Sequence, residues 1–204
     1  MAIITISRQV GSGGDEIASK VCEALGYRYF DKRLMAQVAA ERGIAEGELV
    51  DYSEDEYKLK SFMDALFGRS RPVTTITARQ RDTKGAVTPS TEVLDEERCI
   101  GLIRTAINAA YKRGNVVIVG RGGQAILQEA EDVLHVRIVA PTGDRVKRLQ
   151  EEGMGEEEAR RTLAKRDKAA AQYLESFYGI QWDDLNLYHL TINTGKVNLD
   201  LAVD

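Results

Sequence analysis

Residues 3–18 read IITISRQVGSGGDEIA and constrain the fold more than any other part of the chain. The first residues of this run are mostly β-branched, as in a buried strand. Three glycines within four residues follow, and after them Ile17, Val21 and Leu25 recur at helical spacing. A strand that enters a helix through a glycine-rich turn is typical of α/β proteins with a parallel sheet.

The same turn has the layout of a phosphate-binding loop, GxxxxGK[ST], but it lacks the lysine. Such a loop holds phosphate with backbone N–H groups and the lysine, and it holds magnesium with the hydroxyl. With the second glycine placed on Gly13, Gly14 stands where the lysine belongs. Arg8 then stands where the first glycine belongs, and Asp15 where the hydroxyl belongs. A dinucleotide-binding fingerprint fits no better, because Glu16 occupies the place of its third small residue.

Two interpretations of this turn follow from the residues alone. The first is a tight strand-to-helix turn without a ligand, in which Asp15 caps the helix. The second is a phosphate site at the helix N-terminus, where the glycines let the backbone approach the ligand. In the second case, Arg8 or a cation from elsewhere must replace the missing lysine.

The chain has 204 residues, 43% of them hydrophobic, which suits one domain with an ordinary core. Its net charge of -4 argues against nonspecific binding to nucleic acid or to an anionic membrane surface. No apolar stretch of the sequence is long enough to span a bilayer. Two cysteines, Cys22 and Cys99, are too few for a disulfide framework, so we expect a reducing, cytoplasmic setting.

Residues 27–30 read as a short aromatic strand, and Asp31 can cap the helix that follows. Acidic and spaced apolar residues over 44–67 indicate a partly exposed helical excursion. Arginines, glycines and prolines over 68–90 indicate the least regular segment, with only short strands. This segment is either a solvated loop or a basic flap over an anionic substrate.

Apolar residues at helical intervals predict a long helix over 91–113 that ends at Gly114. The apolar run 116–119 then reads as a central parallel strand, which delivers Arg121 to its carboxyl end. Ligands of open α/β sheets bind at the carboxyl ends of strands, so Arg121 is a candidate to hold a phosphate or carboxylate. The alternative is that Arg121 pairs with a neighbouring acid.

The last third of the chain predicts a strand over 133–140 and a helix that carries Arg145, Lys147 and Arg148. Glycines on both sides of Met154 suit a hinge. The helix after this hinge carries a dense basic set: Arg160, Arg161, Lys165, Arg166 and Lys168. This set is either a solvated face or a lid that neutralises a phosphoryl group in transfer. A last strand over 189–193 and a closing helix over 199–203 complete the expected fold.

Several of these segments together resemble the cytidylate-kinase-like family, a divergent branch of the P-loop nucleoside monophosphate kinases. The similarity is carried by ITISRQVGSGGDEIA at 4–18, YFDK at 29–32, VIVGRGG at 117–123, VRIVAP at 136–141 and YLESFYGIQWDDLNLYHLTINTG at 173–195. It extends over nearly the whole chain and is weakest over 44–90.

The resemblance implies an α/β, three-layer P-loop kinase fold with about five parallel strands in a single domain, 1–204. It places an acceptor-side helical excursion and basic flap at 44–90 and a helical lid at 145–170. The implied reaction moves the γ-phosphoryl group of ATP, with Mg²⁺, to a nucleoside monophosphate, with CMP or dCMP as the first guess. The partners are then ATP and a small phosphorylated acceptor, and the apolar residues of 59–67 could pack against a second copy in a homodimer.

The resemblance also implies roles for single residues. The nucleotide would be bound by the loop and the start of its helix: Gly11, Ser12, Gly13, Gly14, Asp15 and Glu16. Asp31, Lys32 and Arg121 would bind the acceptor, while Arg148 and Arg166 fall where catalytic lid arginines are expected. From the residues themselves, Arg8 is a candidate for the missing catalytic charge, and Asp15 is a candidate magnesium ligand.

Some positions depart from the family pattern. Gly122 replaces an aspartate that contacts the acceptor, and Ala170 and Tyr173 replace an aspartate and an arginine that recognise cytosine and ribose. The acid at Asp15 would repel a phosphate unless it holds magnesium. Two further hypotheses therefore stay open: a nucleotide-binding regulator that has lost the chemistry, and a kinase of a non-nucleotide small molecule.

Overall fold

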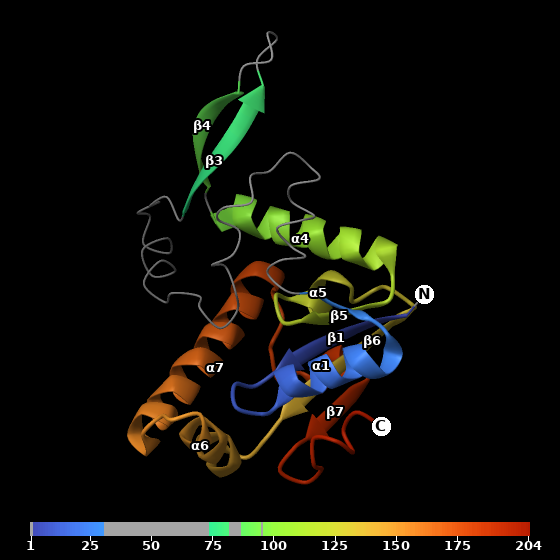
Figure 1. The fold of residues 1–204 in the computed structure, drawn as a ribbon, viewed down its shortest axis with the longest axis vertical. Coiled ribbons are helices and arrows are strands. Elements are labelled where there is room, and N and C mark those ends of the chain that lie inside the picture. The colour runs from blue at the N-terminus through green and yellow to red at the C-terminus, as the bar shows by residue number, and fades with distance from the viewer. Residues whose placement is uncertain (1, 31–73, 82–86, 95) are drawn as a thin grey trace.

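The computed structural model describes residues 2–30, 74–81, 87–94 and 96–204. Its central sheet contains five parallel strands in the order β2-β5-β1-β6-β7. These are β1 (Ile3–Arg8), β2 (Arg28–Phe30), β5 (Val116–Val119), β6 (Val133–Val139) and β7 (Leu190–Asn193). The predicted parallel sheet of about five strands is confirmed (Figure 1).

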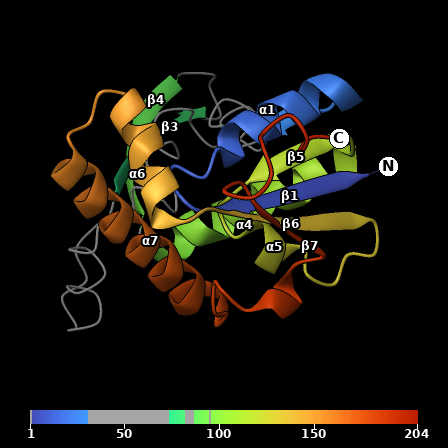
Figure 2. The ribbon, with the colours of Figure 1, turned by 90° about the horizontal axis from the view of Figure 1, so that it is seen from below.

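Helices cover both faces of this sheet and make three layers (Figure 2). Helix α1 (Gly14–Leu25) packs on one face, where Val117 and Val119 of β5 join its core. Val116 and Ile118 point to the other face, because successive side chains of a strand alternate. That face is covered by α4 (Glu96–Arg113), α5 (Gly123–Ile126) and α7 (Glu156–Tyr178).

The region predicted to be a lid is a pair of packed helices. Helix α6 (Thr142–Glu151) joins the start of α7 through a short glycine-containing link. Val146 and Leu149 of α6 pack against Ala159 and Leu163 of α7 in a small core of their own. A short 3-10 helix, η2 (Leu185–Leu187), precedes β7.

The prediction of a helix from residue 91 is wrong at its start, because α4 begins at Glu96. The residues before it form β4 (Val87–Leu94), which pairs antiparallel with β3 (Thr74–Arg81). Two strands of eight residues are also more regular than the short strands expected over 68–90. Both runs are rich in β-branched residues, with threonine and isoleucine in β3 and threonine and valine in β4, and such side chains favour strands over helices.

The expected closing helix over 199–203 is also wrong, since these residues form turns. The side chain of Asn198 accepts the N–H of Leu201 at 2.8 Å, as a helix cap does, but only turns follow it. Leu199 and Val203 instead pack against the core on the α1 side. Among the described helices, none is long and apolar enough to cross a bilayer. The predictions for Asp31, Lys32 and 44–67 lie outside the described residues.

Candidate functional site

The glycine-rich loop leaves β1 at the carboxyl edge of the sheet, where the strand order reverses around β1. Gly11 and Gly13 have φ of 72° and 79°, a conformation that other residues rarely adopt. Gly13 is the N-cap of α1, which begins at Gly14. Asp15 lies in the first turn of the helix, so its expected role as the cap is wrong.

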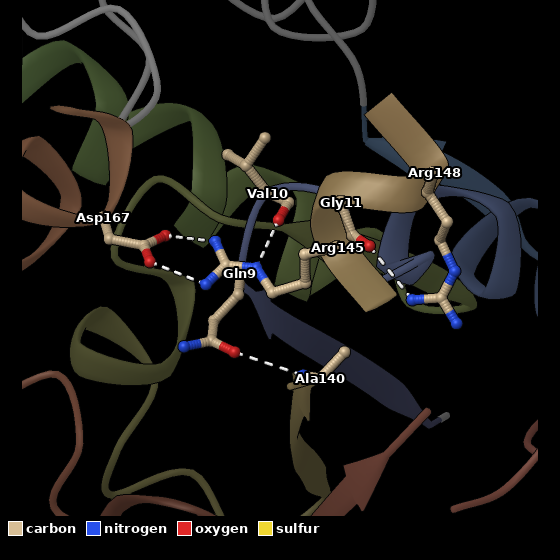
Figure 3. Close-up of polar contacts among 7 residues, drawn as sticks. All are labelled: Gln9, Val10, Gly11, Ala140, Arg145, Arg148 and Asp167. Atoms are coloured by element: carbon tan, nitrogen blue, oxygen red, sulfur yellow. Dashed lines mark hydrogen bonds and ion pairs between the residues drawn. The ribbon is translucent and has the colours of Figure 1, made fainter. Parts of the chain in front are cut away.

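Side chains from distant segments bind three consecutive carbonyls of the loop. Arg145 of α6 donates from Nε to the Val10 oxygen at 2.7 Å, and Arg148 donates from an Nη to the Gly11 oxygen at 3.0 Å (Figure 3). Thr194, just after β7, donates from Oγ1 to the Ser12 oxygen at 2.7 Å. These three bonds hold the carbonyl side of the loop against α6 and the end of β7.

This arrangement fixes the direction of the loop N–H groups. In a trans peptide the N–H points opposite to the carbonyl of the preceding residue. The N–H groups of Gly11 and Gly13 therefore point away from Arg145 and Thr194, and neither has an acceptor within the described ranges. The loop thus presents donors on the face where a phosphate-binding loop needs them.

Arg145 also ties the loop to α7. Its two Nη atoms donate to the two carboxylate oxygens of Asp167 at 2.7 and 2.8 Å, a bidentate ion pair (Figure 3). The Arg145 side chain is almost fully buried. Gln9 adds a further anchor, since its Oε1 accepts the N–H of Ala140 at 3.2 Å. The loop, α6 and α7 are therefore joined by one arginine.

A cavity of about 230 Å³ lies between the loop and the helices α6 and α7. Arg8, Asp15 and Arg166 line it, together with Gly11, Leu149 of α6, Met154 of the link and Thr162 of α7. The structure thus brings Arg166 of α7 to the same space as Arg8 of β1. Arg148 is not among the lining residues, because its guanidinium contacts Gly11 and Thr194.

Asp15 accepts two bonds from Arg8, whose Nε lies 3.2 and 3.3 Å from the two carboxylate oxygens. The Tyr29 hydroxyl of β2 donates to the same carboxylate at 3.3 Å. Burial raises the pKa of Tyr29 above its ordinary value, and the charge of Asp15 adds to this rise, so the phenol stays a donor. Glu16, by contrast, pairs with Lys20 at 3.0 Å on the exposed side of α1.

Arg121 lies just beyond β5, which pairs with β1, so it shares the sheet edge with the loop. Its φ is 55°, between Gly120 and Gly122 at 67° and 70°. A left-handed arginine between two left-handed glycines stores strain, which is common at binding sites. The side chain is 7% exposed, donates to the Phe30 oxygen at 3.4 Å and lies over the Phe30 ring.

The three positions that depart from the family pattern, Gly122, Ala170 and Tyr173, all lie in closely packed parts of the protein. A Cβ on Gly122 would lie 2.5 Å from the ring of Tyr178, so Tyr178 occupies the room of a side chain at 122. Ala170 and Tyr173 are both buried in the core beneath α4. These two side chains contribute to packing between α7 and the sheet.

Sequence reasoning did not identify Arg145, Thr194 or Tyr29 as parts of the site. The first could have been suspected, because Arg145 and Arg148 are three residues apart and share one face of a helix. Thr194 and Tyr29 act over 182 and 14 residues along the chain, and although both fall in segments that carry the family resemblance, nothing in those segments indicates these bonds. Asp31 and Lys32 lie outside the described residues, so their predicted contact with an acceptor stays a prediction.

Comparisons with known proteins agree with the fold. The model of the Cytidylate kinase-like family matches residues 3–196. A cytidylate kinase of Pyrococcus horikoshii is 27% identical over 95% of this chain and 80% of its own length, and that of Pyrococcus furiosus is 26% identical over 97% and 82%. The crystal structure of an uncharacterized protein from Eubacterium ventriosum has the same fold, with a TM-score of 0.64 and 24% identity, over 100% of this chain and 94% of that one.

Proposed function

Because the chain belongs to the cytidylate kinase-like family, we propose that it transfers the γ-phosphoryl group of ATP to a nucleoside monophosphate, with CMP or dCMP as the first acceptor. The observation that carries this proposal is the loop over residues 9–15. Its carbonyls are held on one side, its free N–H groups face the other, and Arg8 and Arg166 line the cavity beside it.

Phosphoryl transfer depends mainly on positioning and on neutralising charge, and the cavity offers both. The loop N–H groups and the two arginines would bind the ATP phosphates, and Arg121 would grip the acceptor phosphate at the neighbouring strand end. Bidentate arginine contacts suit phosphate oxygens. Arg148 would act as a positioning residue, since it holds the Gly11 carbonyl.

The donor set suits magnesium held together with nucleotide. Mg²⁺ usually takes one or two carboxylates plus substrate phosphates. Asp15 offers one carboxylate, 64% exposed, at the cavity wall. No group of three metal-binding side chains occurs in the parts of the chain that the structure describes, so Asp15 would hold the ion only in company with ATP. The ion would neutralise charge on the β- and γ-phosphate oxygens.

A coupled assay of ADP release, run with magnesium and a panel of nucleoside monophosphates, tests the proposal. We expect turnover with CMP or dCMP above the rate of ATP hydrolysis alone. ATP binding by calorimetry without turnover on any acceptor would favour a nucleotide-binding regulator instead. Turnover found only in a panel of phosphorylated metabolites would favour a kinase of a non-nucleotide acceptor.

The role of Arg121 has its own test in steady-state kinetics. Arg121→Ala should raise the KM for the acceptor at least ~10-fold and leave the KM for ATP unchanged, because hydrogen bonds to charged groups contribute ~1.5–3 kcal/mol. Arg121→Lys has the same left-handed backbone and keeps the charge, so it should lose less. An acceptor KM unchanged in Arg121→Ala would remove Arg121 from the acceptor site.

A further inference from the structure

A side chain at position 14, the first residue of α1, would occupy the same space as the side chain of Arg8 in β1. A Cβ added to Gly14 would lie 2.5 Å from Cβ and 2.8 Å from Cγ of Arg8. Protein interiors are close-packed, so a side chain at 14 would have to displace the Arg8 stem. Arg8 therefore occupies the room that a lysine at the start of α1 would need.

The pleat of β1 explains why Arg8 reaches this place. Arg8 and Ile6 point to the same face of the strand, and Ile6 packs in the core beneath α1. The Arg8 side chain is 14% exposed and lines the 230 Å³ cavity with Asp15 and Arg166. A cation in this position borders the face of the loop that carries the free N–H groups.

A phosphate group could replace Asp15 as the partner of Arg8. Asp15 is 64% exposed, and ion pairs open to solvent are weak. A phosphate group carries more charge and more acceptor oxygens than one carboxylate, so it competes well for a guanidinium. Tyr29, which also donates to Asp15, can keep the carboxylate in place when Arg8 turns away.

A buried hydroxyl beside Arg8 also points to a ligand. Ser12 Oγ is fully buried and has no hydrogen-bond partner among the residues described. It lies 3.5 Å from the position of the added Cβ on Gly14, so it borders the same volume. Buried hydroxyls normally find a partner, and none is supplied here by the loop itself.

We propose that Arg8 is the cation that replaces the lysine of this loop, and that Asp15, supported by Tyr29, holds Arg8 until a nucleotide phosphate takes its place. This proposal rests on the proposed function, because it names the residue that binds the ATP phosphates. Positions 8 and 14 are then one exchangeable pair: an arginine at 8 requires a glycine at 14, and a lysine at 14 requires a glycine at 8.

A cycle of variants tests the exchange by calorimetry of ATP binding, with EDTA and again with magnesium. Arg8→Met keeps a stem to pack on Gly14 but removes the charge, and we expect it to weaken metal-free ATP binding at least ~10-fold. Gly14→Lys alone should bind ATP more weakly than wild type, because the two side chains collide. The double variant Arg8→Gly/Gly14→Lys should return to within about threefold of wild type. Arg160→Met, which removes an exposed arginine of α7, is the matched control.

Arg8→Met that binds ATP as wild type does would overturn the proposal. So would a double variant that binds no more tightly than Arg8→Gly. Circular dichroism of each variant separates lost binding from lost fold. If the variants bind ATP as expected but the wild-type protein phosphorylates no acceptor, only the proposed function is overturned. Wild type that phosphorylates CMP while Arg8→Met is unaffected would overturn the Arg8 assignment alone.

Discussion

At the scale of single residues, Gly122 is fixed by backbone conformation and packing together. Its φ of 70° disfavours any residue with a Cβ, and the Tyr178 ring occupies the place where that Cβ would project. The side chain of an aspartate at this position would have no room beside Tyr178. The sequence revealed the substitution, but only the fold shows that Tyr178 takes the vacant space.

Gly122→Ala should therefore destabilise the protein by more than its backbone strain alone. A left-handed alanine costs about 1–2 kcal/mol, and overpacking against Tyr178 adds about 1–3 kcal/mol. Gly26→Ala is the control, because Gly26 has a similar φ of 65° and no atom within 4 Å of an added Cβ. Urea unfolding measures both. Equal losses of unfolding free energy in the two variants would mean that the Tyr178 ring moves aside without a cost in stability.

At the scale of elements, helices α6 and α7 are attached to the glycine-rich loop by Arg145. Exposed ion pairs of α7, such as Arg160 with Glu156 at 2.8 Å, add little in comparison. The buried guanidinium of Arg145 bonds both Val10 and Asp167, so the loop and α7 cannot separate without leaving polar groups unpaired.

Arg145→Met should lower the free energy of unfolding by about 2–4 kcal/mol, because it leaves the Asp167 carboxylate and the Val10 carbonyl without their donor. Arg160→Met, the same change on an exposed pair, should cost less than about 0.5 kcal/mol. Thermal or denaturant unfolding of the two variants gives the comparison. A loss from Arg145→Met no larger than that from Arg160→Met would show that the loop does not depend on this bond.

Most elements could be predicted because their signals are local. The apolar run 116–119 and the helical spacing of Ile17, Val21 and Leu25 each identify an element without distant partners. The errors over 91–94 and 199–203 arose where another segment decided the outcome: pairing with β3 in one case, packing against the α1 core in the other. The carbonyl bonds of the loop could not be predicted, since they join residues more than 130 positions apart.

At the scale of the whole molecule, His135 links β6 to β1 and to the residue that precedes β7. Its Nδ1 lies 2.6 Å from Thr5 Oγ1 of β1, its backbone N–H donates to His189 Nδ1 at 2.9 Å, and its ring stacks on that of His189. Burial lowers the pKa of His135 below its ordinary value, and the neighbouring His189 lowers it further. The folded protein therefore keeps this ring neutral at pH values where the unfolded chain protonates it.

This difference makes stability fall in mild acid. The unfolded state binds more protons than the folded state, so the free energy of unfolding rises with pH. The contribution of His135 is complete above its unfolded pKa of about 6.5 and is lost as pH falls below that value. Urea unfolding at pH 7.5 and 5.5 should show a larger loss for wild type than for His135→Asn. Equal losses would assign the acid sensitivity to other groups.

The bond from Thr194 to the Ser12 carbonyl has a consequence for biosynthesis. A chain that grows from its N-terminus makes the loop early, yet the threonine that holds this carbonyl emerges 182 residues later. A nascent chain on the ribosome therefore carries an incomplete loop until Thr194 has been added. The site reaches its final form only when the sheet gains β7 and the segment after it.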